Sequence, residues 1–309
     1  MSPAKVAIAG MTGKFARLIT MHLLKHPDVQ ITGFCRTPAK LPAEISSNPR
    51  VTIFTASSTD TDTIREAVHG ADICICCYLG DETLMIDGQK ALIDACIAEN
   101  VPRYMDSGYT FDYRPLERGV APQKDFCKDV AEYLEQRADR IKGVQILNGA
   151  FMEVVFAPFY GLFDAERPAL RYWGSGDEML ELTTYEDAAA FAAEVAIDRD
   201  AVGYQSVLGD RKSTKEIAAA IERAYGTSIE LKRLGSLDDL YAKLRATMEA
   251  NPQNMYAWMG MNYNYHGLNG STYLPEKKDA DRYSNLKLTK LEDFLGKYNI
   301  GTLKDAYMF

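Results

Sequence analysis

A glycine-rich turn near the amino terminus is the first feature with chemical meaning. Residues 5–10 form an apolar run typical of a strand, residues 10–16 read Gly-Met-Thr-Gly-Lys-Phe-Ala, and residues 14–26 have helical periodicity. Such a turn lets the backbone approach a pyrophosphate, which N–H groups at the positive end of the helix then bind. The spacing is GxxGxxA rather than GxGxxG, but its place between the first strand and the first helix supports the assignment. We therefore predict a dinucleotide phosphate site made by Gly10, Thr12, Gly13, Lys14 and Phe15.

An arginine at the end of the second expected strand indicates which dinucleotide binds. Proteins that bind NAD carry Asp or Glu at this point, where the carboxylate bonds the ribose 2′-hydroxyl. This chain has Arg36 instead, and Lys40 follows four residues later. A guanidinium matches the geometry of phosphate oxygens, so the arginine selects the 2′-phosphate of NADP. The cofactor that we predict is NADPH.

Lys124 is the candidate catalytic residue. A hydride transfer to a carbonyl or conjugated carbon leaves negative charge, which must meet a proton or a cation. Lys124 begins the helix after the fifth expected strand, directly after Pro122-Gln123, where this fold binds its ligand. The lysine could act as a general acid or as an electrostatic anchor for the nicotinamide ribose and the substrate oxygen. Lys128, one helical turn further, is the rival.

Further side chains are expected around the cofactor and the substrate, because they follow the carboxyl ends of strands or lie in aromatic stretches. Those assigned to the cofactor, besides the residues above, are Ser57, Cys77, Tyr78, Ser107, Asn148 and Phe151, with Lys124 counted in both roles. Those assigned to the substrate are Tyr109, Tyr113, Met152, Tyr263 and His266. The alternative for His266 is a packed loop histidine. No metal site is expected, since Cys74 and Cys77 lack a second ligand pair at matching spacing.

Alternating strands and helices must position these residues. β-rich runs alternate with helical patterns through the first half of the chain, which indicates βαβ units. Strands are expected at 5–10, 29–36, 51–56, 71–77, 102–107 and 144–151, and helices at 14–26, 61–70, 87–101 and 124–138. The predicted fold class is α/β, a doubly wound parallel (Rossmann) sheet with a smaller, mixed α/β C-terminal substrate lobe. We expect the NADP-binding domain at 1–152 and the substrate lobe at 153–309, with some of its segments returning to the Rossmann sheet.

The second half of the chain has a looser pattern. Residues 170–184 predict a hairpin around 174–177, and the alanine-rich run 184–198 predicts a helix capped by Thr184 or Asp187. A strand at 204–209 and a helix at 213–226 follow, the helix beginning with a Ser213 and Glu216 capping box. The stretch 255–273 is rich in Tyr, Met, Asn and Gly without a clean period, so we assign it no element.

Composition excludes several classes of protein. Hydrophobic residues make up 47% and charged residues 25%, and no apolar run reaches the ~18 to 20 residues of a membrane helix. The net charge of −8, without a basic stretch, argues against a nucleic-acid partner. Because a strand is expected within five residues of Met1, we expect no signal peptide. Three of the six cysteines lie in one expected buried strand, which indicates reduced thiols rather than disulfides. We expect a cytoplasmic monomer or homodimer that binds a small-molecule substrate, with no nucleic-acid or membrane partner.

With these residues in view, the chain resembles the NmrA-like and isoflavone-reductase-like branch of atypical short-chain dehydrogenases. The matching pieces include GMTGKFA, the arginine after strand two, DGQKALIDACIAENVPRYMDS, Lys124 with its helix, VQILNGAFMEV, and YHGLNGSTYL before KLTKLEDFL. The resemblance implies that Lys124 is catalytic and that Gly10, Gly13 and Arg36 contact NADPH. Residues 106–110 read Asp-Ser-Gly-Tyr-Thr where the plant reductases have Pro-Ser-Glu-Phe-Gly, so their substrate geometry does not carry over.

Three functions compete on this pattern. The first is an NADPH-dependent reductase of a small aromatic, polyketide- or alkaloid-like molecule (C=O, C=C or C=N), in secondary metabolism, which Lys124 and the aromatic, Met-rich lobe favour. The second is an NADP(H)-sensing regulator without turnover, because the family that the chain resembles includes such proteins. The third is an isomerase or cyclase that holds the cofactor structurally. Binding of NADPH without substrate-dependent oxidation would favour the second.

Overall fold

The structure is a computed structural model that describes residues 4–308. The chain forms two compact units that interleave along the sequence. Unit 1 contains the chain up to Tyr109, residues 124–147 and residues 188–205, and unit 2 contains residues 110–123, 148–187 and those from 206 onward. A single boundary after residue 152 therefore does not describe the division, because 110–123 packs with the later part of the chain and 188–205 with the earlier part.

Unit 1 is a doubly wound parallel sheet, which confirms the predicted fold class. The strand order is β11-β6-β5-β4-β1-β2-β3, and β1 to β6 pair in parallel. The strands are β1 (Lys5–Ala9), β2 (Gln30–Cys35), β3 (Val51–Thr55), β4 (Ile73–Cys76), β5 (Arg103–Met105), β6 (Lys142–Leu147) and β11 (Gly203–Ser206). The helices are α1 (Lys14–Leu23), α2 (Ala43–Ser46), α3 (Thr61–Val68) and α4 (Gln89–Ala98), with short turns η1 (Pro38–Lys40) and η2 (Leu84–Gly88). Most of α5 (Pro122–Glu135) and of α7 (Tyr185–Ile197) also belongs to unit 1, whereas their first residues, 122–123 and 185–187, belong to unit 2.

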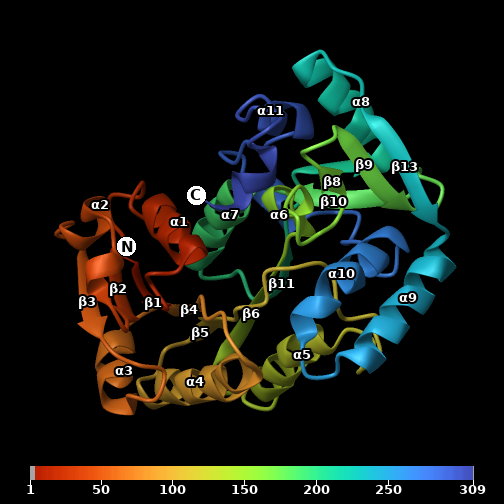
Figure 1. The fold of residues 1–309 in the computed structure, drawn as a ribbon. Helices are drawn as coiled ribbons and strands as arrows, with labels where there is room; N and C mark the ends of the chain where they lie inside the picture. Colours follow the sequence, from red (N-terminus) through yellow and green to blue (C-terminus); the bar gives the residue numbers. More distant parts are fainter. Residues whose placement is uncertain (1–3, 309) are drawn as a thin grey trace. The chain divides into compact units, whose positions relative to one another are not determined.

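Helices cover both faces of this sheet, so its central strands are apolar on both sides. Every residue of β4 is buried, and so are four of the five in β1. On one face Ile64 of α3, Leu92 of α4 and Val130 of α5 join a single apolar core with β1 and β4. Figure 1 shows α3, α4 and α5 along that side of the sheet, and α1 and α7 along the other.

A buried arginine attaches α7 to the sheet. The side chain of Arg103, on β5, is 3% exposed and donates to the carbonyls of Val195 at 3.1 Å and Ala196 at 2.6 Å. Another bond goes to the carbonyl of Asp198, at 2.6 Å. The last carbonyls of a helix lack partners within it, so one guanidinium both caps α7 and satisfies its own buried charge.

Unit 2 contains two three-stranded sheets, ordered β12-β10-β7 and β13-β9-β8. The strands are β7 (Ala150–Phe151), β8 (Phe163–Asp164), β9 (Ala169–Trp173), β10 (Met179–Thr183), β12 (Asp210–Ser213) and β13 (Glu230–Gly235). The helices are α6 (Met152–Val155), α8 (Thr214–Tyr225), α9 (Leu237–Ala250), α10 (Met259–Leu268) and α11 (Leu291–Leu295), with turns η3 (Met255–Ala257), η4 (Asp279–Arg282) and η5 (Leu303–Met308). An apolar core around Phe156, Ile221 and Phe294 joins them.

The hairpin predicted over 170–184 is wrong. β9 pairs with β13 and β8, whereas β10 pairs with β12 and β7, so the two strands belong to different sheets. The turn between them closes on its own backbone, because the carboxylate of Glu178 accepts the N–H groups of Ser175 and Gly176, each at 2.8 Å. Because the turn is held by its own hydrogen bonds, the strands on either side need not pair with each other.

The strand predicted at 144–151 is also interrupted. β6 ends at Leu147, and β7 begins at Ala150 in a sheet of unit 2. Gly149 has a φ of +67°, and a Cβ there would stand 2.7 Å from the carbonyl oxygen of Glu181. Only glycine fits this close approach, and the bend moves the chain from one unit into the other.

The stretch 255–273, to which the sequence assigned no element, contains the helix α10. None of its ten residues is exposed, and the buried ones include Asn262, Asn264 and His266. A helix that is covered on all sides, partly through polar residues, has no amphipathic stripe to recognise. At its start a Cβ on Gly260 would stand 2.2 Å from the carbonyl oxygen of Phe159, so the backbones meet closely. Within residues 4–308, no helix has both the length and the apolar content needed to cross a bilayer.

Candidate functional site

The turn between β1 and α1 has the geometry of a phosphate-binding turn. Gly10 has a φ of +75°, and its N–H donates to the carbonyl of Phe34 on β2 at 3.1 Å. The N–H of Gly13 returns to the carbonyl of Gly10 at 2.9 Å. A Cβ on Gly10 would stand 3.0 Å from the carbonyl oxygen of Cys77, so this position needs glycine for both its φ and its space.

The amino-terminal end of α1 has no side-chain cap. Gly13 is the N-cap residue with φ −62° and ψ 147°, it has no side chain to accept a bond, and the first turn carries no acidic residue. Thr12, Lys14 and Phe15 flank this end as predicted, and Ala16 is fully buried where the helix packs. The first turn of α1 thus places no carboxylate of its own at the positive end of the helix dipole, which suits a pyrophosphate.

Two cations lie just beyond β2. Arg36 and Lys40 are exposed, and neither side chain makes a hydrogen bond or ion pair with any residue that the structure describes. Ser57, after β3, is also exposed, and its hydroxyl meets that of Thr59 at 2.9 Å. Cationic side chains without an ion pair to the described residues are suited to hold the 2′-phosphate of NADP.

Residues that follow β4 and β5 in unit 1 contact one another, and one of them packs against Phe15. The ring of Tyr109 packs edge-on against Phe15 with 4.4 Å between centroids, and its hydroxyl donates to the carbonyl of Cys76 at 3.4 Å. The hydroxyl of Ser107 donates to the carbonyl of Tyr78 at 2.6 Å. Burial raises the pKa of the Cys77 thiol to about 12, so this thiol stays protonated beside the turn. Tyr109, which the sequence assigns to the substrate, thus contacts Phe15, next to the glycine turn.

Sequence reasoning missed Gln89, which holds the Ser107 loop. Its side chain is 2% exposed, and its Oε1 accepts the N–H of Ser107 at 3.1 Å and the hydroxyl of Tyr104 at 3.2 Å. Its Nε2 donates to the carbonyl of Met85 in the π-helical turn η2 at 2.8 Å. The available signal was a glutamine within an expected buried helix, but only the fold shows what it binds.

Lys124 lies in the first turn of α5 and is 8% exposed. Asp106, directly after β5, is 2% exposed, and burial raises its pKa to about 7. The Gly108 N–H, the Lys124 ammonium and the Gln145 side chain each oppose that rise. Sequence reasoning named Lys124 but not Asp106, and an acidic residue at the end of a buried strand was the only signal for it.

The remaining predicted residues belong to unit 2. Asn148 is fully buried, and its backbone N–H donates to the carbonyl of Thr110 at 2.7 Å. The ring of Phe151 stacks on Tyr185 with 4.0 Å between centroids, and Met152 is fully buried in the apolar core. Tyr113 is 1% exposed, whereas Tyr263 is half-buried between Phe111 and Phe159.

His266 lies inside α10 rather than in a loop. Its side chain is 2% exposed, and burial lowers its pKa to about 4, against the opposing effect of the Val120 carbonyl. Asn262, one turn earlier, donates to that same carbonyl at 2.9 Å and accepts from Gln123 at 2.7 Å. The imidazole is therefore neutral near pH 7 and can offer one donor and one acceptor, but no charge.

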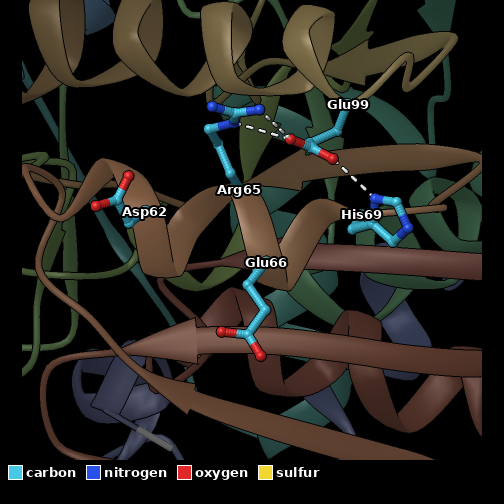
Figure 2. Close-up of a pocket in the computed structure, with 5 residues that line it drawn as sticks. All are labelled: Asp62, Arg65, Glu66, His69 and Glu99. Atoms are coloured by element: carbon cyan, nitrogen blue, oxygen red, sulfur yellow. Dashed lines mark hydrogen bonds and ion pairs between the residues drawn. The ribbon is translucent and has the colours of Figure 1, made fainter.

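A pocket on the surface of unit 1 lies apart from these assignments. It is lined by Asp62, Arg65, Glu66, His69 and Glu99 (Figure 2). The carboxylate of Glu99 meets Arg65 Nε at 2.8 Å and His69 Nδ1 at 2.8 Å, and these two contacts lower its pKa, the histidine contact more strongly. Because Arg65, His69 and Glu99 pair with one another, and no predicted site residue lines the pocket, we assign it no role.

Known proteins match both the fold and the turn. Residues 10–144 match a family model described as NAD(P)H-binding, so this part of the chain is an NAD(P)H-binding domain. The structure of AtPrR2 with NADP+ and (+)pinoresinol aligns with a TM-score of 0.78 and 16% identity, over 97% of this chain and 100% of that one. An isoflavone reductase aligns with a TM-score of 0.77 and 17% identity, over 96% and 99% of the two chains. No curated protein matches the sequence.

A bacterial structure aligns as well. The NADPH-dependent quinone oxidoreductase QOR2 from Escherichia coli has a TM-score of 0.72 and 19% identity, over 94% of this chain and 98% of that one. These likenesses confirm the fold that the predicted resemblance implies. At such identities they establish the fold, and the chemistry has to be argued from the residues of this chain.

Proposed function

We propose that this protein is an NADPH-dependent reductase of a small aromatic, polyketide- or alkaloid-like molecule with a C=O, C=C or C=N bond. The observation that carries the proposal is a buried lysine, Lys124, beside the buried carboxyl of Asp106, in the unit that carries the uncapped phosphate turn. A lysine held in a desolvated place can donate a proton where charge develops. Of the three solved structures above, one contains NADP+, one is of an isoflavone reductase and one is of an NADPH-dependent quinone oxidoreductase. These similarities support an NADPH-dependent reductase.

The residues divide the work as follows. The Gly10 turn and the first N–H groups of α1 hold the pyrophosphate, while Arg36 and Lys40 hold the 2′-phosphate. When bound, NADPH would supply the hydride. Lys124 gives a proton to the acceptor atom on which negative charge develops, or stabilises that charge as a cation. Within unit 2, Tyr263 packs edge-on against Phe111 and His266 is neutral, and Tyr263 and His266 stay predicted substrate residues.

Oxidation of NADPH against a panel of quinones, enones, aromatic ketones and imines tests the proposal. With an accepted substrate, Lys124→Ala should lower kcat by a factor on the order of 10² to 10⁴, while the affinity for NADPH changes far less. Lys128→Ala, one helical turn further along α5, is the matched control and should keep most of the rate. NADPH binding without oxidation of any acceptor would favour the regulator, and product formation without net NADPH consumption would favour the isomerase.

A further inference from the structure

The carboxyl of Asp106 is enclosed between β6 and α5. The backbone N–H of Asp106 continues the sheet by donating to the carbonyl of Val144 on β6 at 3.1 Å. Its Oδ1 accepts the N–H of Gly108 at 3.0 Å, and the side chain of Gln145, also on β6, acts to lower the pKa of Asp106. Asp106 and Gln145 are 2% and 5% exposed, so bulk water does not solvate this acid.

Gly108 and Cys127 locate the carboxyl against α5. A Cβ on Gly108 would stand 2.8 Å from Oδ1 of Asp106 and 3.5 Å from Sγ of Cys127, so the glycine backbone fits between the acid and the helix. Lys124 lies three residues before Cys127 on α5, and residues three apart share one face of a helix. The positive charge of the Lys124 ammonium acts to lower the pKa of Asp106 and that of Cys127.

The neighbours of Asp106 that can titrate do so far from neutrality. Burial raises the pKa of the Cys127 thiol to about 11 and also raises that of the Tyr109 hydroxyl, so both stay neutral. The charge of Asp125, in the first turn of α5, also raises the pKa of Cys127. Burial raises the pKa of Asp106 to about 7, which makes it the member of this group that changes charge near neutral pH.

We propose that Asp106 is a positioning residue for Lys124, and that its carboxyl, by gaining or losing a proton, sets how readily the Lys124 ammonium gives up its own. The inference rests on the proposed reductase function and deepens it. With the acid neutral, the ammonium loses one buried anion and becomes the stronger proton donor; with the carboxylate present, the proton is held more tightly. The proton that passes from Lys124 to the acceptor leaves a neutral amine, and water returns a proton to that amine after product release.

A titration without cofactor or substrate tests the pair directly. Carbon-13 NMR of aspartate carboxyls, with the Asp106 signal assigned by its loss in Asp106→Asn, should show a midpoint near pH 7. Lys124→Met removes the neighbouring positive charge and should raise that midpoint by about one unit or more. Lys128→Met is the control and should leave the midpoint in place. A midpoint at the ordinary value of an aspartate, or one that Lys124→Met does not move, would overturn the proposal.

The pH dependence of turnover supplies the second arm. In the unmutated protein kcat should fall as pH rises through about 7, whereas Asp106→Asn, which mimics the neutral acid, should stay flat at the faster rate through that range. Glu153→Gln is the matched control, because it removes a buried carboxyl with a similar pKa from unit 2 and should leave the inflection in place. An inflection that persists in Asp106→Asn contradicts the proposal. Absence of NADPH oxidation in every protein would overturn the reductase function instead, and the NMR titration would still decide whether Asp106 and Lys124 are coupled.

Discussion

Two helices, α1 in unit 1 and α8 in unit 2, begin in opposite ways. In unit 2, α8 begins with Ser213, whose Oγ accepts the N–H of Glu216 at 3.2 Å while the Glu216 carboxylate accepts the N–H of Ser213 at 2.8 Å. In unit 1, α1 begins at Gly13 with no side-chain cap at all. A capping box satisfies N–H groups within the protein and contributes stability, whereas an uncapped end keeps its dipole and donors for an anion. Under the proposed function, the α8 beginning serves the fold and the α1 beginning serves binding.

The sharpest way to break this comparison is to give α1 a cap. The backbone of Gly13, at φ −62° and ψ 147°, suits an N-cap Asp, although its Cβ would stand a tight 3.2 Å from the carbonyl oxygen of Gly10. Gly13→Asp should therefore change the free energy of unfolding by less than about 1 kcal/mol. NADPH affinity should fall by about 100-fold or more, or roughly 2.7 kcal/mol, because a carboxylate occupies the place of the pyrophosphate.

Titration of nicotinamide fluorescence and thermal unfolding measure the two effects. Gly13→Ala separates the space taken by a Cβ from the charge, and it should lose much less affinity than Gly13→Asp. A folded Gly13→Asp protein that binds NADPH as tightly as the parent would show that this helix end is not the phosphate site.

A second change tests whether the cations beyond β2 select the phosphate. Arg36→Asp should weaken NADPH by about 2 kcal/mol, or roughly 30-fold, because a charge-assisted contact is lost and a repulsion is added. NADH, which has no 2′-phosphate, should bind no more weakly than before. Arg140→Asp makes the same charge change at another exposed position of unit 1 and serves as the control. Equal affinities of the unmutated protein for both cofactors would contradict this assignment.

The converse change belongs to unit 2. Ser213→Ala removes the N-cap acceptor of α8 and should lower the free energy of unfolding by about 1 kcal/mol, since one N–H loses its partner. NADPH affinity should not change, because the cap serves the fold alone. Urea unfolding and cofactor titration of the same preparation give both numbers. A loss of cofactor affinity without a loss of stability would show that the two helix ends do not differ as we propose.

A further test concerns pH. Burial raises the pKa of Glu153 from 4.5 to about 7, and its two carboxyl oxygens accept the N–H of Tyr185 at the start of α7, each at 3.1 Å. Between those two values the unfolded chain has lost the proton that the folded protein keeps, so this group makes the free energy of unfolding fall as pH rises from about 4.5 to 7. Glu153→Gln should remove that part of the fall.

Thermal unfolding at several pH values, compared between parent and variant, measures this contribution. Glu186→Gln changes an exposed acid in the same first turn of α7 and should leave the profile unchanged. His266 affects the free energy of unfolding in the opposite direction. Its pKa is lowered from 6.5 to about 4, so its contribution to stability is lost as pH falls below about 6.5. Identical pH profiles of the parent and Glu153→Gln would show that Glu153 titrates normally in the folded protein.

Local patterns in the sequence were sufficient for the elements that depend on near neighbours. The parallel sheet, the turn from Gly10 to α1, the cap of α8 and the position of Arg36 after β2 follow from periodicity, glycine conformation and capping chemistry, which act over a few residues. Such signals are readable because their free energy arises within one segment. The same signals failed where a buried polar helix, α10, has no apolar stripe, and where a turn resembles a hairpin but joins two sheets.

Only the tertiary structure decided which groups share an environment. Asp106 follows a strand like many other acids, and it became a candidate because β6, Gly108 and α5 remove it from water and bring it near Lys124. Gln89 likewise gains its meaning from Ser107 and Tyr104, which are distant in the chain. Desolvation and charge interactions depend on distance in space, so a sequence can name a candidate catalytic lysine from its local motif but not the carboxyl that is buried beside it.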